Sequence, residues 1–258
     1  FVSPELQQRF DPELAPVALQ NPISSDLAVM RTSLMPGLVA AASHNIKRQQ
    51  SRVKLFETGL RFMPGETVTQ EPMMAMLMCG SRLPEVWSAK AEAVDFYDLK
   101  GEIQALLCGA AEALSFRPTV VAALHDGQTA EILLNDCAVG VMGRLHPRTA
   151  KALDMPGATF VAELSLAEIS QVPVPHFQEI SKFPEIRRDI AVIVNRETPA
   201  QAVLDCAQEA AGEALAQALI FDVYEGGGVD QTAKSLAIGL TFRDQSRTLT
   251  DEEITASL

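Results

Sequence analysis

Apolar residues alternate with polar or small ones in three stretches of the last third of the chain, residues 189–194, 219–224 and 235–242. Side chains two residues apart point to the same face of a strand, so this pattern predicts three strands. In the middle stretch the apolar set Leu219, Phe221 and Val223 is predicted to face the core.

Helix signals lie between the first two of these strands and after the third. Thr198 and Gln201 have capping-box spacing, Pro199 suits the first helical position, and Gly212 can end the helix. The same spacing at Thr250 and Glu253 begins a last helix, while residues 226–228 are a glycine turn between the second and third strands. The order β-α-β-β-α is one strand short of the ferredoxin-like motif, so we expect a truncated domain.

The first part of the chain mixes strands and helices without a regular βαβ rhythm. Pro36 can open a helix that runs through Ile46, and residues 53–62 alternate as a strand. The methionine-rich run at residues 73–78 is typical of a buried strand, and adaptable thioethers explain it better than a soft-metal site. This mixture predicts a mostly antiparallel α+β sheet.

A second helix is predicted downstream, with Asp95 and Asp98 at its N-terminus. Its buried face follows the i, i+3, i+4, i+7, i+11 spacing: Ile103, Leu106, Leu107, Ala110 and Leu114. Next comes a hairpin that turns at Asn135-Asp136, with Gly140 and Gly143 in its returning strand.

The end of this part is a short strand over residues 158–163, followed by a capping box at Ser165 and Glu168. Pro173 and Pro175 then disfavour both helix and ladder pairing. We therefore expect one domain over residues 1–172, a linker over 173–181 and a second domain over 182–258.

The second domain is predicted to have one face covered by its two helices and one open face. Small and polar residues with one aromatic make up the open face: Ala191, Asp222, Tyr224, Ser235, Ala237, Gly239 and Thr241. Small side chains let a ligand approach the backbone, and an aromatic ring can stack on an unpaired RNA base. Several cations flank the strands and are candidates for phosphate contacts: Arg187, Arg188, Lys234, Arg243 and Arg247. A solvated sheet face with ordinary surface charges fits the same pattern, and this fold hosts many functions.

Composition narrows the function classes. With 21 Lys and Arg against 33 Asp and Glu the formal net charge is −12, which argues against indiscriminate binding to DNA or RNA. No apolar run approaches the ~20 residues of a membrane helix, so no membrane association is expected. The four cysteines are scattered without a C-x-x-C pair and are expected to be reduced core residues of a cytoplasmic protein. The four histidines stand far apart, so no metal site is predicted. The start FVSPELQQRF suggests part of a longer protein.

Three motifs in the second domain carry a resemblance: FPEIRRDIA at 183–191, IFDVYEG at 220–226 and KSLAIGL at 234–240. From Lys182 to Leu258 the chain is similar to the ferredoxin-fold anticodon-binding domain of bacterial phenylalanyl-tRNA synthetase β subunits. In that family the base at the tip of the anticodon packs on the sheet face. The resemblance therefore implies anticodon-binding positions at Ala191, Asp222, Tyr224 and Ser235.

The first domain resembles the preceding module of the same subunit, through NPIS at 21–24, MRTSLMPGL at 30–38, LFETGLRF at 55–62, VDFYDLKG at 94–101 and GRLHP at 143–147. This resemblance implies a class II synthetase-like but non-catalytic module. It also implies a catalytic α-subunit partner in an (αβ)2 heterotetramer, phenylalanine tRNA as the RNA partner, and ATP and Mg²⁺ used by the assembled enzyme rather than bound by this piece.

The sequence lacks a motif of active class II enzymes, which agrees with a non-catalytic module. Glu57 has Leu55, and not arginine, two residues before it, so the usual Arg-x-Glu strand motif is absent. We expect no catalytic residues, cofactor or metal within this chain. The alternative is a metabolite-sensing regulatory protein, which would favour a glycine-rich turn between strand and helix. Residues 194–198 hold no glycine, and the missing catalytic groups argue against a stand-alone enzyme.

Overall fold

The structure, a computed structural model, describes residues 1–171, 177, 181–244 and 246–256. The chain divides into two compact units, Phe1–Pro175 and His176–Leu258, each with its own core. The predicted linker, with its two prolines, lies outside the described residues apart from Phe177 and Ser181.

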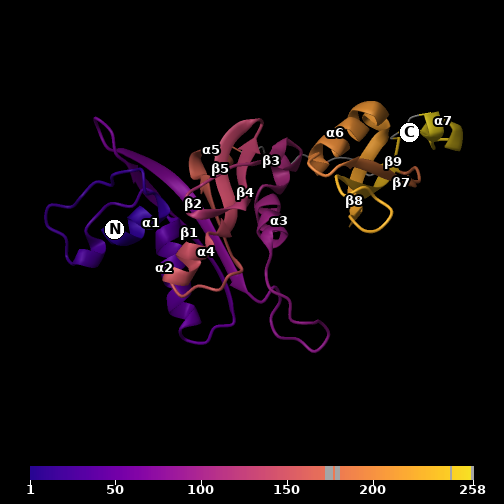
Figure 1. The fold of residues 1–258 in the computed structure, drawn as a ribbon. Helices are drawn as coiled ribbons and strands as arrows, with labels where there is room; N and C mark the ends of the chain where they lie inside the picture. The colour runs from indigo at the N-terminus through magenta and orange to yellow at the C-terminus, as the bar shows by residue number, and fades with distance from the viewer. Residues whose placement is uncertain (172–176, 178–180, 245, 257–258) are drawn as a thin grey trace. The chain divides into compact units, whose positions relative to one another are not determined.

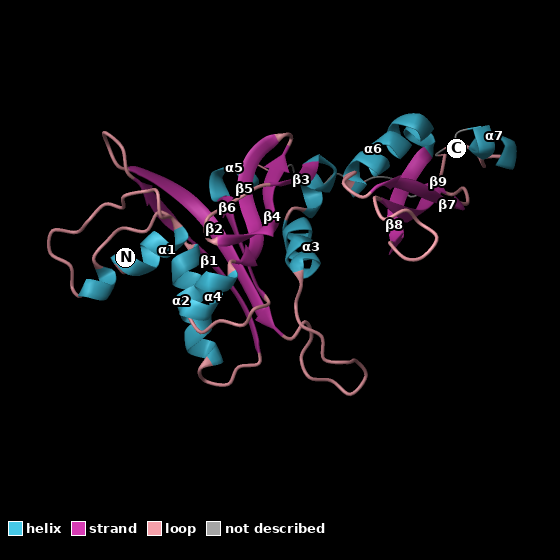
Figure 2. Ribbon diagram, viewed as in Figure 1, coloured by secondary structure: helices cyan, strands magenta, loops and turns pink. Residues whose placement is uncertain are grey.

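The first unit is a single antiparallel sheet with helices on both faces (Figures 1 and 2). Its strands follow the order β1-β2-β6-β5-β4-β3 across the sheet. The strands are β1 (Arg52–Met63), β2 (Thr69–Gly80), β3 (Leu114–Pro118), β4 (Leu124–Leu134), β5 (Cys137–Leu145) and β6 (Thr159–Ser165). The helices are α1 (Pro4–Phe10), α2 (Met35–Ile46), α3 (Phe96–Leu106), α4 (Pro147–Ala152) and α5 (Leu166–Ile169), with 3-10 turns at Ser25–Leu27 and Cys108–Ala113. The predicted antiparallel α+β class is confirmed.

The two faces of this sheet carry separate cores. Helix α2 packs with Ala75, Leu77 and Val161 on one face. Helix α3 packs with Met78 and Ala162, the neighbours of those residues along the strands, on the other face. Because successive strand residues point to opposite faces, the two helices cover opposite sides of β2 and β6, as Figure 2 shows.

Most of the predicted elements of this unit are present. The β4–β5 hairpin turns at Asn135 and Asp136, whose φ angles of 51° and 61° are those of the expected tight hairpin turn. Asp95 and Asp98 form a reciprocal capping box at the start of α3. Ser165 accepts a hydrogen bond from the Glu168 backbone N–H at 3.5 Å, which caps α5.

The prediction of where the second helix ends was wrong. Helix α3 stops at Leu106, which is 42% exposed, and Leu107 leaves the helical region with φ −104° and ψ 27°. Leu114 begins β3 instead of ending a helix. Its backbone pairs with Leu134, the last residue of β4. This ladder between residues far apart in the sequence overrides the local helix propensity.

The second unit contains β7 (Ile186–Asn195), α6 (Ala200–Ala211), a 3-10 turn Gly212–Ala214, β8 (Leu215–Tyr224), β9 (Ala233–Phe242) and α7 (Asp251–Ala256). Its three-stranded antiparallel sheet has the order β7-β9-β8. The predicted order β-α-β-β-α is confirmed. Gly212 ends α6 with a φ of 63°, a left-handed conformation that favours glycine.

The two predicted helix caps in this unit differ in outcome. Thr250 and Glu253 cap α7, because the Thr250 backbone N–H donates to the Glu253 carboxylate at 2.9 Å. The capping box predicted at Thr198 does not form, and Pro199 is the N-cap of α6 rather than its first residue. Pro199 has an extended ψ of 136°, so the helix starts one residue later and the Thr198 side chain lies too early in the chain to cap it.

The cysteines are all free, but only Cys79 is buried. The prediction that all four are core residues was therefore wrong for Cys108, Cys137 and Cys206, which are exposed. Burial raises the pKa of the Cys79 thiol to about 11. None of the helices in the described parts of the chain is long and apolar enough to cross a bilayer.

Candidate nucleic-acid interface

The sheet of the second unit buries one face against its helices. Leu236, Ile238, Leu240 and Phe242 of β9 are each at most 3% exposed. Ile190, Val192 and Val194 of β7 pack against the same cluster. The intervening side chains point the other way, so the opposite face of this sheet, called here the open face, carries its small and polar residues.

One row across the open face joins all three strands. Ala191 of β7 lies opposite Ala237 of β9, and Asp222 of β8 lies opposite Ala237 on its other side. Directly paired residues of antiparallel strands point to the same face. The Asp222 carboxylate therefore stands beside two alanines, which leave room above the backbone.

The next row lies one pair along the same face. Ser235 of β9 pairs with Ile193 of β7 on one side and with Tyr224 of β8 on the other. Two adjacent rows thus bring together the four anticodon-binding positions predicted from the sequence: Ala191, Asp222, Tyr224 and Ser235.

The Tyr224 ring is held at the edge of the open face. It is 48% exposed, and its hydroxyl donates to the backbone carbonyl oxygen of Gly227 at 3.0 Å. A Cβ at position 226 would lie 2.5 Å from the ring, so Gly226 lets the following turn pass close to it. The ring is therefore positioned by the β8–β9 turn, with about half of its surface free.

A β-bulge in β8 corrects the predicted alternation. Ile220 pairs with Ile238, and the next pair is Asp222 with Ala237, so Phe221 is the extra residue. Leu219 pairs with Gly239 and lies on the open face, not in the core, and both Leu219 and Phe221 are 50% exposed. Because both residues are apolar, the sequence predicted that they face the core. Nothing in the local pattern indicates the bulge.

Arg187 is the predicted phosphate contact that lies on the open face. It pairs with Thr241, and its guanidinium stands 5.4 Å from the centre of the Phe221 ring. Its Nε donates to Asp189 Oδ1 at 2.8 Å. The open face therefore has a second aromatic ring, Phe221, which is partly covered by a cation.

The other predicted phosphate contacts lie elsewhere in this unit. Like Arg187, which is paired with Asp189, three of them are paired with carboxylates: Arg188 with Asp251, Arg243 with Glu185, and Arg247 with Glu253. The Arg247 hydrogen bond lowers the pKa of Glu253 to about 2. Lys234 of β9 lies opposite Val194 of β7, on the helix-covered face of the sheet.

Comparison with known proteins accounts for both units. Residues 1–166 match the family model described as phenylalanyl tRNA synthetase beta chain CLM domain, and residues 181–258 match the ferredoxin-fold anticodon binding domain. The phenylalanine–tRNA ligase beta subunit of Pseudomonas fluorescens Pf-5 is 48% identical over 260 residues, covering 100% of this chain and 33% of its own length. The subunit of Hahella chejuensis is 45% identical over 256 residues, covering 99% of this chain and 32% of its own.

The chain belongs to the phenylalanyl-tRNA synthetase β-chain family. It spans about a third of the length of the curated relatives that it matches. This membership favours the ligase-subunit interpretation of the sequence over a metabolite sensor.

In this member of the β-chain family, the first unit carries an ion network on the α2 side of its sheet. Arg31 Nη1 lies 2.5 Å from Glu57 Oε1, and Arg61 Nη2 lies 2.6 Å from Glu71 Oε2. Both arginines are therefore neutralised by carboxylates of the chain itself. Among the described residues, no group of three or more His, Cys, Asp and Glu side chains is arranged to hold a metal ion.

Glu163 connects this network to the start of α2. It is 5% exposed, and its Oε1 accepts hydrogen bonds from the Leu34 backbone N–H at 2.5 Å and from Ser33 Oγ at 3.1 Å. Burial raises the pKa of Glu163, although these hydrogen bonds and Arg61, 3.9 Å away, oppose the shift. Glu163 thus ties β6 to the helix that follows the MRTS segment.

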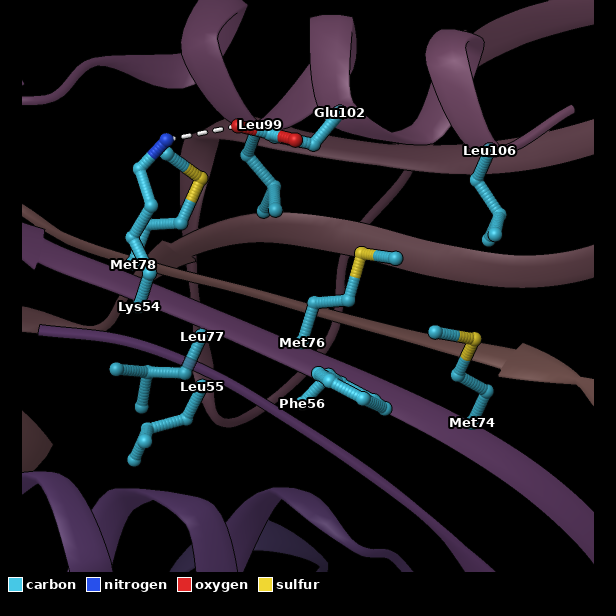
Figure 3. A pocket seen from close by; sticks show the side chains of 10 residues that line it. All are labelled: Lys54, Leu55, Phe56, Met74, Met76, Leu77, Met78, Leu99, Glu102 and Leu106. Carbon is cyan, nitrogen blue, oxygen red and sulfur yellow. Dashed lines mark hydrogen bonds and ion pairs between the residues drawn. The ribbon is translucent and has the colours of Figure 1, made fainter. Parts of the chain in front are cut away.

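An apolar groove of about 430 Å³ runs between β1, β2 and α3 of the β-chain module (Figure 3). Its floor carries Met74, Met76 and Met78, and Leu99 and Leu106 reach it from α3, as Figure 3 shows. Lys54 and Glu102 close one end with a 2.7 Å ion pair. Phe56 lies at the groove and is 70% exposed. The predicted methionine-rich strand is confirmed, but three of its four methionines line this groove, and of these three only Met78 is buried.

Proposed function

We propose that this chain is the part of phenylalanine–tRNA ligase that holds the anticodon of phenylalanine tRNA on the open face of its second unit. The observation that carries this proposal is the pair of adjacent rows that brings Ala191, Asp222, Tyr224 and Ser235 together. An unstacked base can lie over the alanines and stack on Tyr224, while Asp222 and Ser235 offer hydrogen-bond partners to its edge.

The arginines proposed from the sequence as phosphate contacts differ in where they lie relative to the open face. Arg187 shares the open face with the site and is the cation best placed to meet the backbone next to a bound base. All four arginines would have to exchange a carboxylate partner to meet a phosphate, so Arg187 differs from Arg188, Arg243 and Arg247 by its position on the open face. Bulk attraction is also weak in a chain of net charge −12, which makes recognition depend on the local face.

The first unit is proposed to serve as a non-catalytic partner of the ligase α subunit in an (αβ)2 assembly in the cytoplasm. Arg31 and Arg61 are each occupied by a carboxylate, so neither is a free clamp for a transferring phosphate. ATP and Mg²⁺ would then act on the α subunit of the assembled enzyme. The exposed Phe56 beside a methionine-lined groove supports a protein-binding role for this unit.

Filter binding with the chain co-purified with its α subunit tests the proposal. Phenylalanine tRNA and an anticodon-substituted version would be compared at about 150 mM salt, where non-specific phosphate binding is reduced. Weaker binding of the substituted tRNA is expected. Equal binding of the two tRNAs would contradict anticodon recognition by this piece, and failure to co-purify would contradict the α-subunit pairing.

A further inference from the structure

The first unit has a second cavity, of about 710 Å³, separate from the groove of Figure 3. Helix α3 contributes to both: Leu99, Glu102 and Leu106 line the groove, whereas Phe96, Tyr97 and Lys100 line the cavity. Strands β3 to β6 supply the remaining walls. The volume lies within the roughly 300–1,000 Å³ typical of small-molecule sites.

Aromatic rings form much of the cavity wall. Phe96 and Tyr97 from α3 meet edge to face, with ring centres 5.8 Å apart. Phe116 of β3 and Phe160 of β6 line the sheet side, and Phe160 is 4% exposed. Four rings from a helix and two strands offer edge-to-face and stacking contacts to a planar ligand.

Two cations line the same cavity without a carboxylate partner among the described residues. Lys100 Nζ lies 4.8 Å from the centre of the Phe116 ring, and burial lowers the pKa of Lys100. Arg144 donates from Nε to the Gly157 carbonyl oxygen at 2.7 Å and keeps its other guanidinium donors. A partly desolvated ammonium gains from a nearby anion, because burial weakens the competing hydration.

The carboxylates that line the cavity do not neutralise these cations. Asp95 accepts from Arg82 Nη2 at 2.8 Å and from the Asp98 backbone N–H at 2.9 Å. Asp126 is exposed and has no ion pair in the described parts of the chain. An anionic ligand group is therefore favoured near Lys100 and Arg144 and disfavoured near Asp126.

We propose that this cavity binds a small aromatic anion, a molecule with one planar ring and one carboxylate or phosphate group. The ring would pack among Phe96, Phe116 and Phe160, and the anion would contact Lys100 and Arg144. This site is independent of the anticodon-binding proposal, since every residue of it belongs to the first unit.

Calorimetric titration of the whole chain with three probes tests the proposal: 3-phenylpropionate, phenyl phosphate and 2-phenylethylamine. Binding of at least one anion with a Kd below about 1 mM is expected, and the better anion identifies the acidic group. The amine has the same ring and the opposite charge, so it should bind at least roughly tenfold more weakly. Comparable binding of the amine, or no binding of either anion at about 1 mM, would overturn the proposal.

Two variants connect any binding to this cavity. Lys100→Met keeps the apolar stem and removes the charge, and should weaken the anion roughly tenfold or more. The matched control is Lys90→Met, in an exposed loop, which should bind like the wild type. Phe116→Leu removes one ring while keeping apolar volume and should also weaken binding, with folding of each variant checked by circular dichroism. Unchanged affinity in folded Lys100→Met or folded Phe116→Leu would overturn the assignment.

Discussion

Asp222 of β8 lies directly opposite Ala237 of β9, although two positions earlier Ile220 pairs with Ile238. The bulge at Phe221 absorbs the extra residue and returns Asp222 to the open face. Without the bulge, the period of two that sends Ile220 into the core would send Asp222 there as well. The carboxylate of the proposed anticodon site is thus exposed because of a single irregularity in one strand.

Replacing Tyr224 tests whether its ring stacks on the anticodon. Tyr224→Ala removes the ring and should weaken binding of phenylalanine tRNA to the assembled enzyme by about 1–3 kcal/mol. Tyr224→Phe keeps the ring and loses only the hydrogen bond to Gly227, so it should stay near wild type. Equal tRNA affinity of the alanine variant and the wild type in filter binding would remove Tyr224 from the site.

Replacing Phe56 tests the protein-binding role of the groove surface. Phe56→Ser should weaken association with the α subunit, because it removes an exposed apolar ring beside the methionine floor. Its effect on stability should stay within about 0.5 kcal/mol, as for most exposed positions. Val120→Ser, at a residue that is 72% exposed outside the groove, is the matched control. Titration of labelled α subunit measures both, and equal affinities of the two variants would refute the role of Phe56.

The pH dependence of stability should reflect Glu163. Burial raises its pKa above the ordinary 4.5, so the folded chain holds this proton more tightly than the unfolded chain. The contribution of Glu163 to stability therefore falls as pH rises through the window that opens at about 4.5. Glu163→Gln keeps an acceptor for the Leu34 N–H and removes the titration.

We expect the free energy of unfolding of Glu163→Gln, minus that of the wild type, to grow as pH rises from about 4.5. Urea unfolding across that range measures this difference. Glu66→Gln, at an exposed turn, serves as a control that should show no such trend. A difference that does not change with pH would show that the hydrogen bonds and arginines around Glu163 cancel the effect of burial on its pKa.

The cap of α3 should be measurable in the stability of the first unit. Asp95→Ala loses the hydrogen bond from the Asp98 backbone N–H and the ion pair with Arg82. A cost of about 0.5–2 kcal/mol is expected from the cap. Asp95→Ser keeps a capping oxygen and should recover most of that cost. Thermal unfolding that shows no difference between the alanine and serine variants would argue against the capping contribution.

Local pattern was sufficient where an element follows its own periodicity. The helix from Pro36 to Ile46, the β4–β5 hairpin and the strands of the second unit were predicted because each has a regular apolar set and a recognisable cap or turn. The prediction that the second helix extends to Leu114 was wrong, because the structure of that segment is not decided by local pattern. The alanine-rich segment has good helix propensity, and the ladder with β4 that makes Leu114–Pro118 a strand depends on residues far along the chain.

The candidate site was predictable in part. The motifs around Ala191, Asp222, Tyr224 and Ser235 supplied its positions, and only the strand register shows that all four share one face. Leu219 and Phe221 were assigned to the core because apolar residues in an alternating stretch normally face inward. Their exposure follows from the bulge, which no residue type in that stretch specifies.

The most direct test of the anticodon assignment is the ratio of Kd values for anticodon-substituted and wild-type phenylalanine tRNA in an Ala191→Leu variant. Leucine at this position fills the space beside Ala237 and leaves the charge of the face unchanged. We expect this ratio to fall by roughly five- to 150-fold, the equivalent of one lost base contact. Ala202→Leu, on the exposed side of α6, should keep the wild-type ratio. A wild-type ratio in Ala191→Leu would contradict recognition of the anticodon on this face.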